Sequence, residues 1–233
     1  INETATYNIS TMTMSLGTST LFSDESSCNT FIPTFKEAVD KAYAQSMTVI
    51  ASSGNSGSSG SLSLPACLSN VTSVGSTQDS NDAISGFSNY GPLLDVFAPG
   101  SNINSTAQQN CPAGGVGQVC DSDRYLVLSG TSMAAPHAAG LTALLHQYRK
   151  VKYNKTIAPD LMEALMECSG KLIHDSGTND LFMPRIDALA AVTAIDTPVN
   201  FENFTNHLTN NFSKSTLEQL MVFENMTIGN DFG

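Results

Sequence analysis

The sequence predicts an α/β fold built around a mostly parallel sheet. Strand-like and helix-like segments follow one another along the chain, and the strand-like ones are short and end at Gly or Pro. A strand, a helix and a second strand in succession form the βαβ unit of a parallel sheet. The chain has 233 residues, of which 41% are hydrophobic and 13% charged, so it has apolar material for one core of ordinary size.

The first such unit lies near the N-terminus. Residues 11–17 alternate polar and apolar side chains and stop at a glycine, as a strand that runs into a loop does. Residues 46–51 are typical of a buried strand. Between the two strands, residues 33–44 place apolar side chains at helical spacing, at Phe35, Ala38, Val39 and Ala42.

Further strands and a long helix follow. Residues 70–75 and 93–100 read as two short strands, each ended by Gly or Pro. Residues 132–149 predict a fully buried helix, because small residues fill its first half and leucines its second. Pro136 is compatible with the start of this helix, where the N–H groups have no intrahelical partner.

The last predicted helices mark the end of the core-bearing region. Residues 160–168 and 185–192 predict shorter amphipathic helices. The composition then changes to Asn, Phe and Thr, with a single helical pattern at 215–223. We therefore expect one domain over residues 1–196, followed by a tail or the start of another module over residues 197–233.

Charge and hydropathy argue against two classes of partner. The chain carries 10 basic and 21 acidic residues, a net charge of −11, and its longest basic run is Arg149-Lys150. Nucleic-acid binding needs clustered cations, so we expect no nucleic-acid partner. No stretch approaches the roughly 18 apolar residues of a membrane span, and residues 1–10 lack the features of a signal peptide.

The cysteines and asparagines favour a secretory route. Five cysteines form no Cys-x-x-Cys pair, which leaves zinc and thioredoxin-like sites without support. Cys111 and Cys120 bracket a Gly-rich loop and suit a local disulfide; buried free thiols are the alternative, and the odd count leaves one thiol unexplained. Asn-x-Ser/Thr acceptor sequences occur at Asn2, Asn8, Asn70, Asn104, Asn154, Asn203, Asn211 and Asn225. We expect a secreted, or secretory-pathway, glycoprotein with disulfide bonds.

Ser132 is the candidate nucleophile. It lies between Gly-Thr and a helix of small residues, where free N–H groups stabilise developing negative charge. On position alone, an N-cap role is the commoner one for such a serine. However, residues 130–140, GTSMAAPHAAG, resemble the nucleophile motif of subtilisin-like serine proteases almost residue for residue. The one departure is Ala138, where the family usually carries Val.

This resemblance covers about residues 11–195, in the family's order. Residues 14–17, Met-Ser-Leu-Gly, resemble its substrate-binding strand, whose edge would pair with a peptide backbone. Residues 51–57 resemble the segment of the oxyanion asparagine, and residues 87–100 resemble a structural run. The resemblance implies the three-layer α/β subtilisin-like fold with a mostly parallel sheet, here without its N-terminal strands.

Site roles are implied residue by residue. Ser132 would attack the substrate carbonyl, and Asn55 would donate its side-chain amide to the oxyanion; a turn role for Asn55 is the alternative. The substrates would be peptides or proteins. Calcium is the one cofactor that the resemblance allows, and no ligand cluster for it is recognisable. Walls of the substrate pocket would come from Ser15, Leu16, Gly17, Ser52, Ser53 and Gly54.

A general base and its orienting carboxylate are not recognisable in this sequence. In the family both precede the point where the chain begins, and no histidine here stands in the family's His-Gly-Thr context. The five-residue spacing predicts that His137 turns away from Ser132 as a framework residue. Asp-Ser-Gly at 175–177 resembles the family's aspartate motif, but it follows the serine and is a common turn sequence. We expect a fragment that is almost inactive without the missing N-terminal part of the domain.

Two alternatives to a subtilisin-like endopeptidase stay open. A secreted glycoprotein could keep the scaffold as a non-catalytic module, and the complete gene would then lack the Asp and His motifs as well. The sedolisin group of acid peptidases shares a Gly-Thr-Ser nucleophile on a related fold, although Pro136-His137 suits subtilisins better. A serine endopeptidase acting through an acyl-enzyme is the function that the sequence favours.

Overall fold

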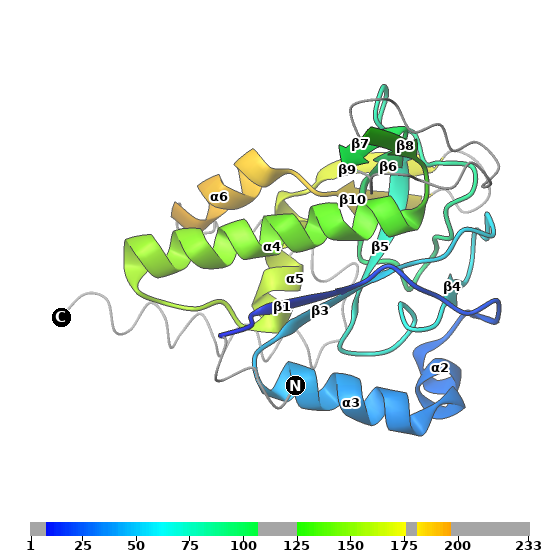
Figure 1. Ribbon diagram of the computed structural model, residues 1–233, viewed down its shortest axis with the longest axis horizontal. Coiled ribbons are helices and arrows are strands. Elements are labelled where there is room, and N and C mark those ends of the chain that lie inside the picture. Colours follow the sequence, from blue (N-terminus) through cyan, green and yellow to red (C-terminus); the bar gives the residue numbers. More distant parts are fainter. Residues whose placement is uncertain (1–7, 107–124, 176–180, 197–233) are drawn as a thin grey trace.

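The computed structural model describes residues 8–106, 125–175 and 181–196. These residues form three layers, with a six-stranded sheet between two sets of helices (Figure 1). The strands, in spatial order, are β1 (Thr11–Met14), β3 (Thr48–Ser52), β5 (Thr72–Gln78), β6 (Val96–Ser101), β10 (Leu181–Arg185) and β9 (Lys171–Asp175). The helices are α2 (Glu25–Phe31) and α3 (Pro33–Ala44) on one face, and α4 (Thr131–Tyr153), α5 (Pro159–Ser169) and α6 (Ala188–Asp196) on the other.

The sheet is mostly parallel, as predicted. Strands β1, β3, β5 and β6 run side by side in the same direction, and Arg185 of β10 pairs in parallel with Phe97 of β6. Only β9 runs antiparallel, against β10. Two short antiparallel pairs lie outside this sheet: β2 (Leu21–Phe22) with β4 (Leu62–Ser63), and β7 (Ile103–Thr106) with β8 (Tyr125–Leu128).

Strand β3 separates two hydrophobic cores. Val49 and Ala51 face the core beneath α2 and α3, whereas Ile50 faces the core beneath α4 and α5. This alternation follows from the two-residue period of a strand. Both faces of the sheet are therefore covered, as a parallel sheet requires.

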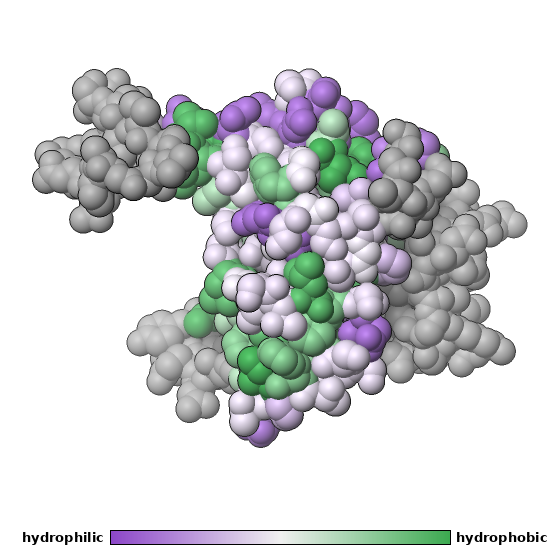
Figure 2. Space-filling model, turned by 90° about the vertical axis from the view of Figure 1, so that its right-hand side faces the viewer, coloured by the Kyte–Doolittle hydropathy of each residue, from purple (hydrophilic) through white to green (hydrophobic). Residues whose placement is uncertain are grey.

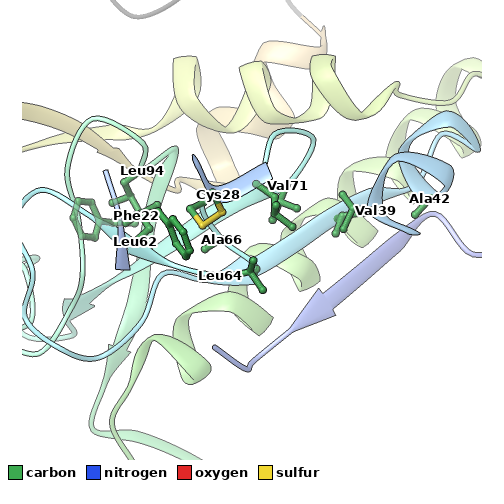
Figure 3. Close-up of a cluster of buried hydrophobic side chains, with 14 of the residues drawn as sticks. Phe22, Cys28, Val39, Ala42, Leu62, Leu64, Ala66, Val71 and Leu94 are labelled. Atoms are coloured by element: carbon green, nitrogen blue, oxygen red, sulfur yellow. A yellow bond between two sulfur atoms is a disulfide. The ribbon is translucent and has the colours of Figure 1, made fainter. Parts of the chain in front are cut away.

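A disulfide lies in the core beneath α2 and α3. Cys28 of α2 is bonded to Cys67, with a Cα–Cα distance of 5.9 Å. Figure 3 shows this bond among buried apolar side chains that include Phe22 and Ala66. The sequence did not predict this pairing, and the predicted Cys111–Cys120 bond lies outside the described residues. Cys168 is a free, partly buried thiol.

Most predicted elements are confirmed, with two errors. Helix α3 spans the predicted residues 33–44. The predicted helix over 132–149 exists and continues to Tyr153, but it is not fully buried as expected, because Leu144 is 59% exposed. The helix predicted over 185–192 is wrong at its start, because Arg185 belongs to β10. Asp187 Oδ1 accepts a hydrogen bond from Ala190 N at 3.0 Å, so the carboxylate caps the helix after the strand has ended.

Helix α4 is the long central helix of its layer (Figure 1). Ala134, Ala135 and Ala138 are fully buried on its sheet-facing side, so the helix axis can approach the strands closely. Within the described residues, no helix is long and apolar enough to cross a membrane.

Candidate active site

Ser132 is the second residue of α4. Gly130 immediately precedes the helix, and its N–H donates to Gly100 O, in β6, at 2.8 Å. This bond fixes the start of α4 beside a central strand of the sheet. The N–H groups of the first turn have no acceptor within the helix, so they and the helix dipole favour negative charge there.

Figure 2 views the molecule from the side on which α4 begins. Pale residues of near-neutral hydropathy occupy much of the centre of this face, and green apolar groups lie among them. Ser132 is partly exposed, so its hydroxyl is accessible to a substrate.

Ser15 and Ser132 are joined by two hydrogen bonds. Ser15 Oγ donates to Ser132 O at 2.8 Å, and Ser132 Oγ donates to Ser15 O at 3.5 Å. The second contact is long, so the Ser132 hydroxyl is only weakly held in this arrangement. The structure therefore brings the candidate nucleophile against the residue that follows β1, which is the predicted substrate-binding segment.

Asn55 lies beside the start of α4. Its Oδ1 accepts hydrogen bonds from Thr131 N at 2.8 Å and from Thr131 Oγ1 at 2.9 Å. A backbone N–H can only donate, so Asn55 must present its carbonyl oxygen to Thr131. The Nδ2 group then keeps its donors for another acceptor. Asn55 is exposed, and an oxyanion can serve as that acceptor.

Thr131 also connects to the neighbouring loop. Its Oγ1 accepts a hydrogen bond from Gly54 N at 3.2 Å, and its side chain is fully buried. In the sequence this threonine is one residue of the Gly-Thr-Ser motif, and no pattern indicated a separate role for it. The structure gives it a positioning role, since it holds the Asn55 amide in one orientation.

A buried asparagine organises the other side of the loop. Asn89 Oδ1 accepts hydrogen bonds from Ser56 N at 2.9 Å and Ser58 N at 3.0 Å, and its Nδ2 donates to Ser53 O at 3.2 Å. Asn89 is fully buried, so these bonds supply the partners that its amide needs. Nothing in the sequence indicated this role beyond the resemblance of its segment to a structural run.

The predicted pocket residues divide into exposed and buried groups. Leu16 is 55% exposed, and Ser15 and Gly17 are exposed beside it. Ser52 Oγ is buried and lies 3.4 Å from Leu16 O and 3.5 Å from Met14 O. Ser52 therefore ties the exposed segment to the neighbouring strand β3.

Ser53 and Gly54 complete the loop. Ser53 is fully buried, and its Oγ donates to Asn89 O at 2.7 Å. Gly54 has φ of +108°, and a Cβ there would lie 2.3 Å from both Asn89 Nδ2 and Ser63 Oγ. Glycine is required at this position by the backbone conformation and by the close packing.

A surface hollow of about 360 Å³ adjoins Ser132. His137 lines it too, although the spacing had predicted a side chain turned well away from the nucleophile. The hollow extends along more than one turn of α4, which explains how residues five apart reach it. His137 Nδ1 donates to Met133 O at 2.8 Å, as expected of a framework residue. The lining residues are Ile103, Asn104, Ser105, Ser132, Met133, Pro136 and His137.

Of the Asp-Ser-Gly sequence, the structure describes only Asp175. Asp175 ends β9, at the opposite edge of the sheet from β1, and the His174 ring stacks on Phe182 at 4.4 Å. Ser132 is hydrogen-bonded to the segment that follows β1. Asp175 thus ends an edge strand that lies across the sheet from the segment in contact with Ser132.

Cation ligands were not recognised in the sequence, but the structure brings three carboxylates together. Oxygens of Asp95, Glu163 and Glu167 lie within 4.8 Å of one another. Oxygen donors of this kind suit a hard cation such as calcium. Glu163 and Glu167 are four residues apart on a predicted helix, which places them on one face, but nothing in the sequence indicated that Asp95 lies near them.

Comparisons with known proteins agree with this geometry. The model of the subtilase family, Peptidase_S8, matches residues 2–183. A thermophilic serine proteinase of Bacillus sp. (strain AK1) is 36% identical over 167 residues, which are 71% of this chain and 36% of the relative. Subtilisin Savinase of Lederbergia lenta is 37% identical over 144 residues, which are 62% of this chain and 48% of the relative. The chain thus spans between about a third and a half of the length of these relatives.

Solved structures show the same fold. A lanthipeptide protease superposes with a TM-score of 0.67 at 20% identity, covering 83% of this chain and 64% of that chain. The prenylagaramide maturation protease PagA superposes with a TM-score of 0.62 at 25% identity, covering 82% of this chain and 64% of that chain. The three-layer α/β arrangement is therefore shared with known proteases.

Proposed function

The chain belongs to the subtilase family, and from this premise we propose that it is the nucleophile-bearing part of a serine endopeptidase, with Ser132 as the nucleophile. The observation that supports this proposal most is the orientation of Asn55. The carbonyl oxygen of Asn55 accepts both hydrogen bonds from Thr131, so among the described residues its Nδ2 donors have no partner, and they lie next to a serine at a helix start. This arrangement supports the roles of nucleophile and oxyanion donor.

The reaction would proceed through an acyl-enzyme. Ser132 Oγ attacks the carbonyl carbon of the scissile peptide bond while its proton passes to a general base. The carbonyl oxygen becomes an oxyanion, which accepts hydrogen bonds from Asn55 Nδ2 and from Ser132 N–H. The base then gives this proton to the amine nitrogen as the C–N bond breaks and the oxyanion returns to a carbonyl, which leaves an ester on Ser132. Water, deprotonated by the same base, hydrolyses this ester in a second, similar step and releases Ser132.

We further propose that the base and its orienting carboxylate come from a preceding part of the same domain. This chain spans only 36% to 48% of the relatives quoted above. Among the described strands, β1 pairs with β3 alone, so its other edge can accept a strand from that part. The chain by itself would then hydrolyse peptides at a rate close to zero.

The substrate would bind along residues 15–17. These residues follow β1, are exposed, and lie against Ser132, so an extended peptide could pair with their backbone and present its carbonyl to Ser132 Oγ. Pairing through main-chain groups favours peptide or protein substrates of many sequences. The walls of the substrate pocket would be formed by Ser15, Leu16, Gly17, Ser52, Ser53 and Gly54.

A secreted glycoprotein is the form we propose for the complete protein. Four Asn-x-Ser/Thr acceptors fall in the described residues, and all four are exposed: Asn8, Asn70, Asn104 and Asn154. The Cys28–Cys67 disulfide also fits an oxidising compartment. Mass spectrometry of secreted protein before and after treatment with a glycosidase would test this assignment.

Hydrolysis of a denatured protein substrate tests the catalytic proposal. The complete protein should cleave it at neutral pH and lose cleavage on Ser132→Ala, whereas Ser129→Ala, a nearby exposed serine, should keep it. Folded protein without activity at any pH would favour the non-catalytic alternative. Activity confined to about pH 3–4 would favour a sedolisin-like carboxylate base, because a histidine base is protonated in acid.

A further inference from the structure

Three carboxylates, one before β6 and two on α5, converge in the fold. Asp95 immediately precedes β6, and Glu163 and Glu167 lie one turn apart on α5. Each offers an oxygen within 4.8 Å of the other two. Glu167 is only 9% exposed, and the other two are partly buried.

Strand β5 holds two of the three side chains. Asp95 Oδ2 accepts a hydrogen bond from Ser73 N at 2.6 Å, and Glu163 Oε2 accepts one from Thr72 Oγ1 at 2.7 Å. These bonds fix the carboxylates and leave each with a second oxygen. The convergence is therefore built into the fold rather than formed by mobile surface side chains.

The third carboxylate lacks such a partner. Glu167 Oε2 is buried and has no hydrogen-bond partner among the described residues. A buried carboxylate oxygen without a partner is costly, so a group other than the described residues, such as an ion or a water molecule, is expected to satisfy it. The oxygen lies in the same cluster as the carboxylates of Asp95 and Glu163.

The charges around the cluster are acidic. Burial raises the pKa of all three carboxyl groups, and their mutual repulsion together with Glu25 and Asp160 adds to the effect. None of the charges that shift these three pKa values is a cation. Like charges held this close need either protons or a metal ion to neutralise them.

We propose that Asp95, Glu163 and Glu167 bind a divalent cation of the size and hardness of Ca²⁺. The donor set consists of oxygens, which hard cations prefer. Ca²⁺ binds oxygen at about 2.3–2.6 Å, so two ligands of one ion lie at most about 5 Å apart. The observed limit of 4.8 Å lets all three carboxylates reach one ion. Water would complete its coordination shell.

The ion would be a structural cross-link. It would join α5 to the start of β6 and, through Thr72 and Ser73, to β5. None of its three ligands belongs to the machinery proposed around Ser132. The expected effect is therefore on stability, with hydrolysis changed only as far as the folded fraction changes.

Counting bound ions tests the site directly. Complete protein freed of metal with a chelator would be dialysed to equilibrium against radioactive Ca²⁺, as wild type, Glu167→Gln and Glu163→Gln. We expect each variant to bind one ion fewer per molecule than wild type. Glu37→Gln is the matched control, because Glu37 is an exposed acid paired with Lys41 on α3, and it should bind the wild-type number. Equal numbers in wild type and in both folded cluster variants would overturn the proposal.

Thermal unfolding separates a metal site from a protonated cluster. In Ca²⁺ the Tm of wild type should rise, and that rise should be smaller in both Gln variants and unchanged in Glu37→Gln. Without Ca²⁺, in the presence of chelator, each Gln variant should have a Tm at least as high as that of wild type, because the substitution removes a repelling charge. A smaller response to Ca²⁺ in these variants then reports lost ion binding and not misfolding. A wild-type Tm that does not respond to Ca²⁺ at neutral pH would mean that protons neutralise the cluster, and would contradict the proposed site.

Discussion

Asn55 Oδ1 accepts two hydrogen bonds from one residue, Thr131, at 2.8 Å from its backbone N and 2.9 Å from its Oγ1. The pair links the loop after β3 to the first residue of α4, although 76 residues separate the two positions. It sets the direction of the Asn55 amide group before any substrate binds. Preorganised donors of this kind stabilise an oxyanion without reorganisation at the moment of reaction.

Asn55→Ala should reduce kcat in the complete protein and change KM little, because the lost donor acts on the oxyanion and not on the bound substrate. Removal of such a donor from a subtilisin, a member of the same family, lowers kcat by about 10²–10³, and we expect a similar loss. Steady-state kinetics on a peptide substrate would measure it. Asn81→Ala, an exposed loop variant, serves as the control. A loss in Asn55→Ala as small as in that control would contradict the oxyanion role.

Thr131→Val should lower kcat by less than Asn55→Ala does. The variant loses the Oγ1 bond to Asn55 and the acceptor of Gly54 N, but the backbone bond to Asn55 stays. The free energy of unfolding should fall by about 1–3 kcal/mol, since a buried donor loses its partner. Thr131→Ser keeps the hydroxyl and should recover most of both losses. If Ser and Val variants behave alike, the hydroxyl does not position Asn55.

The Cys28–Cys67 disulfide should contribute substantially to stability. It joins positions 39 residues apart, and closing a loop of that size restricts the unfolded chain. Replacing both cysteines with Ala should lower the free energy of unfolding by about 2–4 kcal/mol in urea titrations. Cys168→Ala, which removes the free thiol, should cost much less. The reverse order of effects would show that the bond is not formed in solution.

Ionised Asp196 should stabilise the folded protein, and this contribution should be lost at acidic pH. Lys152 Nζ at 2.7 Å, with the hydroxyls of Tyr148 and Tyr153 at 2.5 Å and 2.8 Å, lowers its pKa to about 2. In the unfolded chain the pKa of an aspartate is about 4. The stabilisation by ionised Asp196 is therefore fully present above about pH 4 and is lost as the pH falls to about 2. Asp196→Asn should therefore lower Tm at neutral pH and flatten the fall of Tm in that window in calorimetry. Asp79→Asn should retain the wild-type profile.

Local patterns predicted the elements of the fold well. The spacing of apolar residues gave α3 with its observed bounds, and the run of small residues identified α4. The parallel pairing of β1 with β3 followed from strand, helix and strand in succession. The motif around Ser132 and the order of the neighbouring segments singled out Ser132 and Asn55 together, and the structure has both at the start of α4.

Long-range pairings could not be predicted in the same way. The bonds of Thr131 to Asn55, and the convergence of Asp95 with Glu163 and Glu167, join residues that no local pattern relates. The Cys28–Cys67 bond was missed for the same reason, since connectivity cannot be deduced from cysteine spacing alone. The start of α6 was misplaced because β10 continues to Arg185, whose partner Phe97 lies far away in the sequence.

Covalent labelling with a fluorophosphonate probe tests the role of Ser132 most directly, because the probe reacts with activated serine nucleophiles and needs no knowledge of the substrate. The complete protein and its Ser132→Ala variant would be treated in parallel and the modified peptide identified by mass spectrometry. We expect the label on Ser132 in the wild type and no label in the variant. Labelling that survives the substitution would place the nucleophile elsewhere and contradict the proposed function.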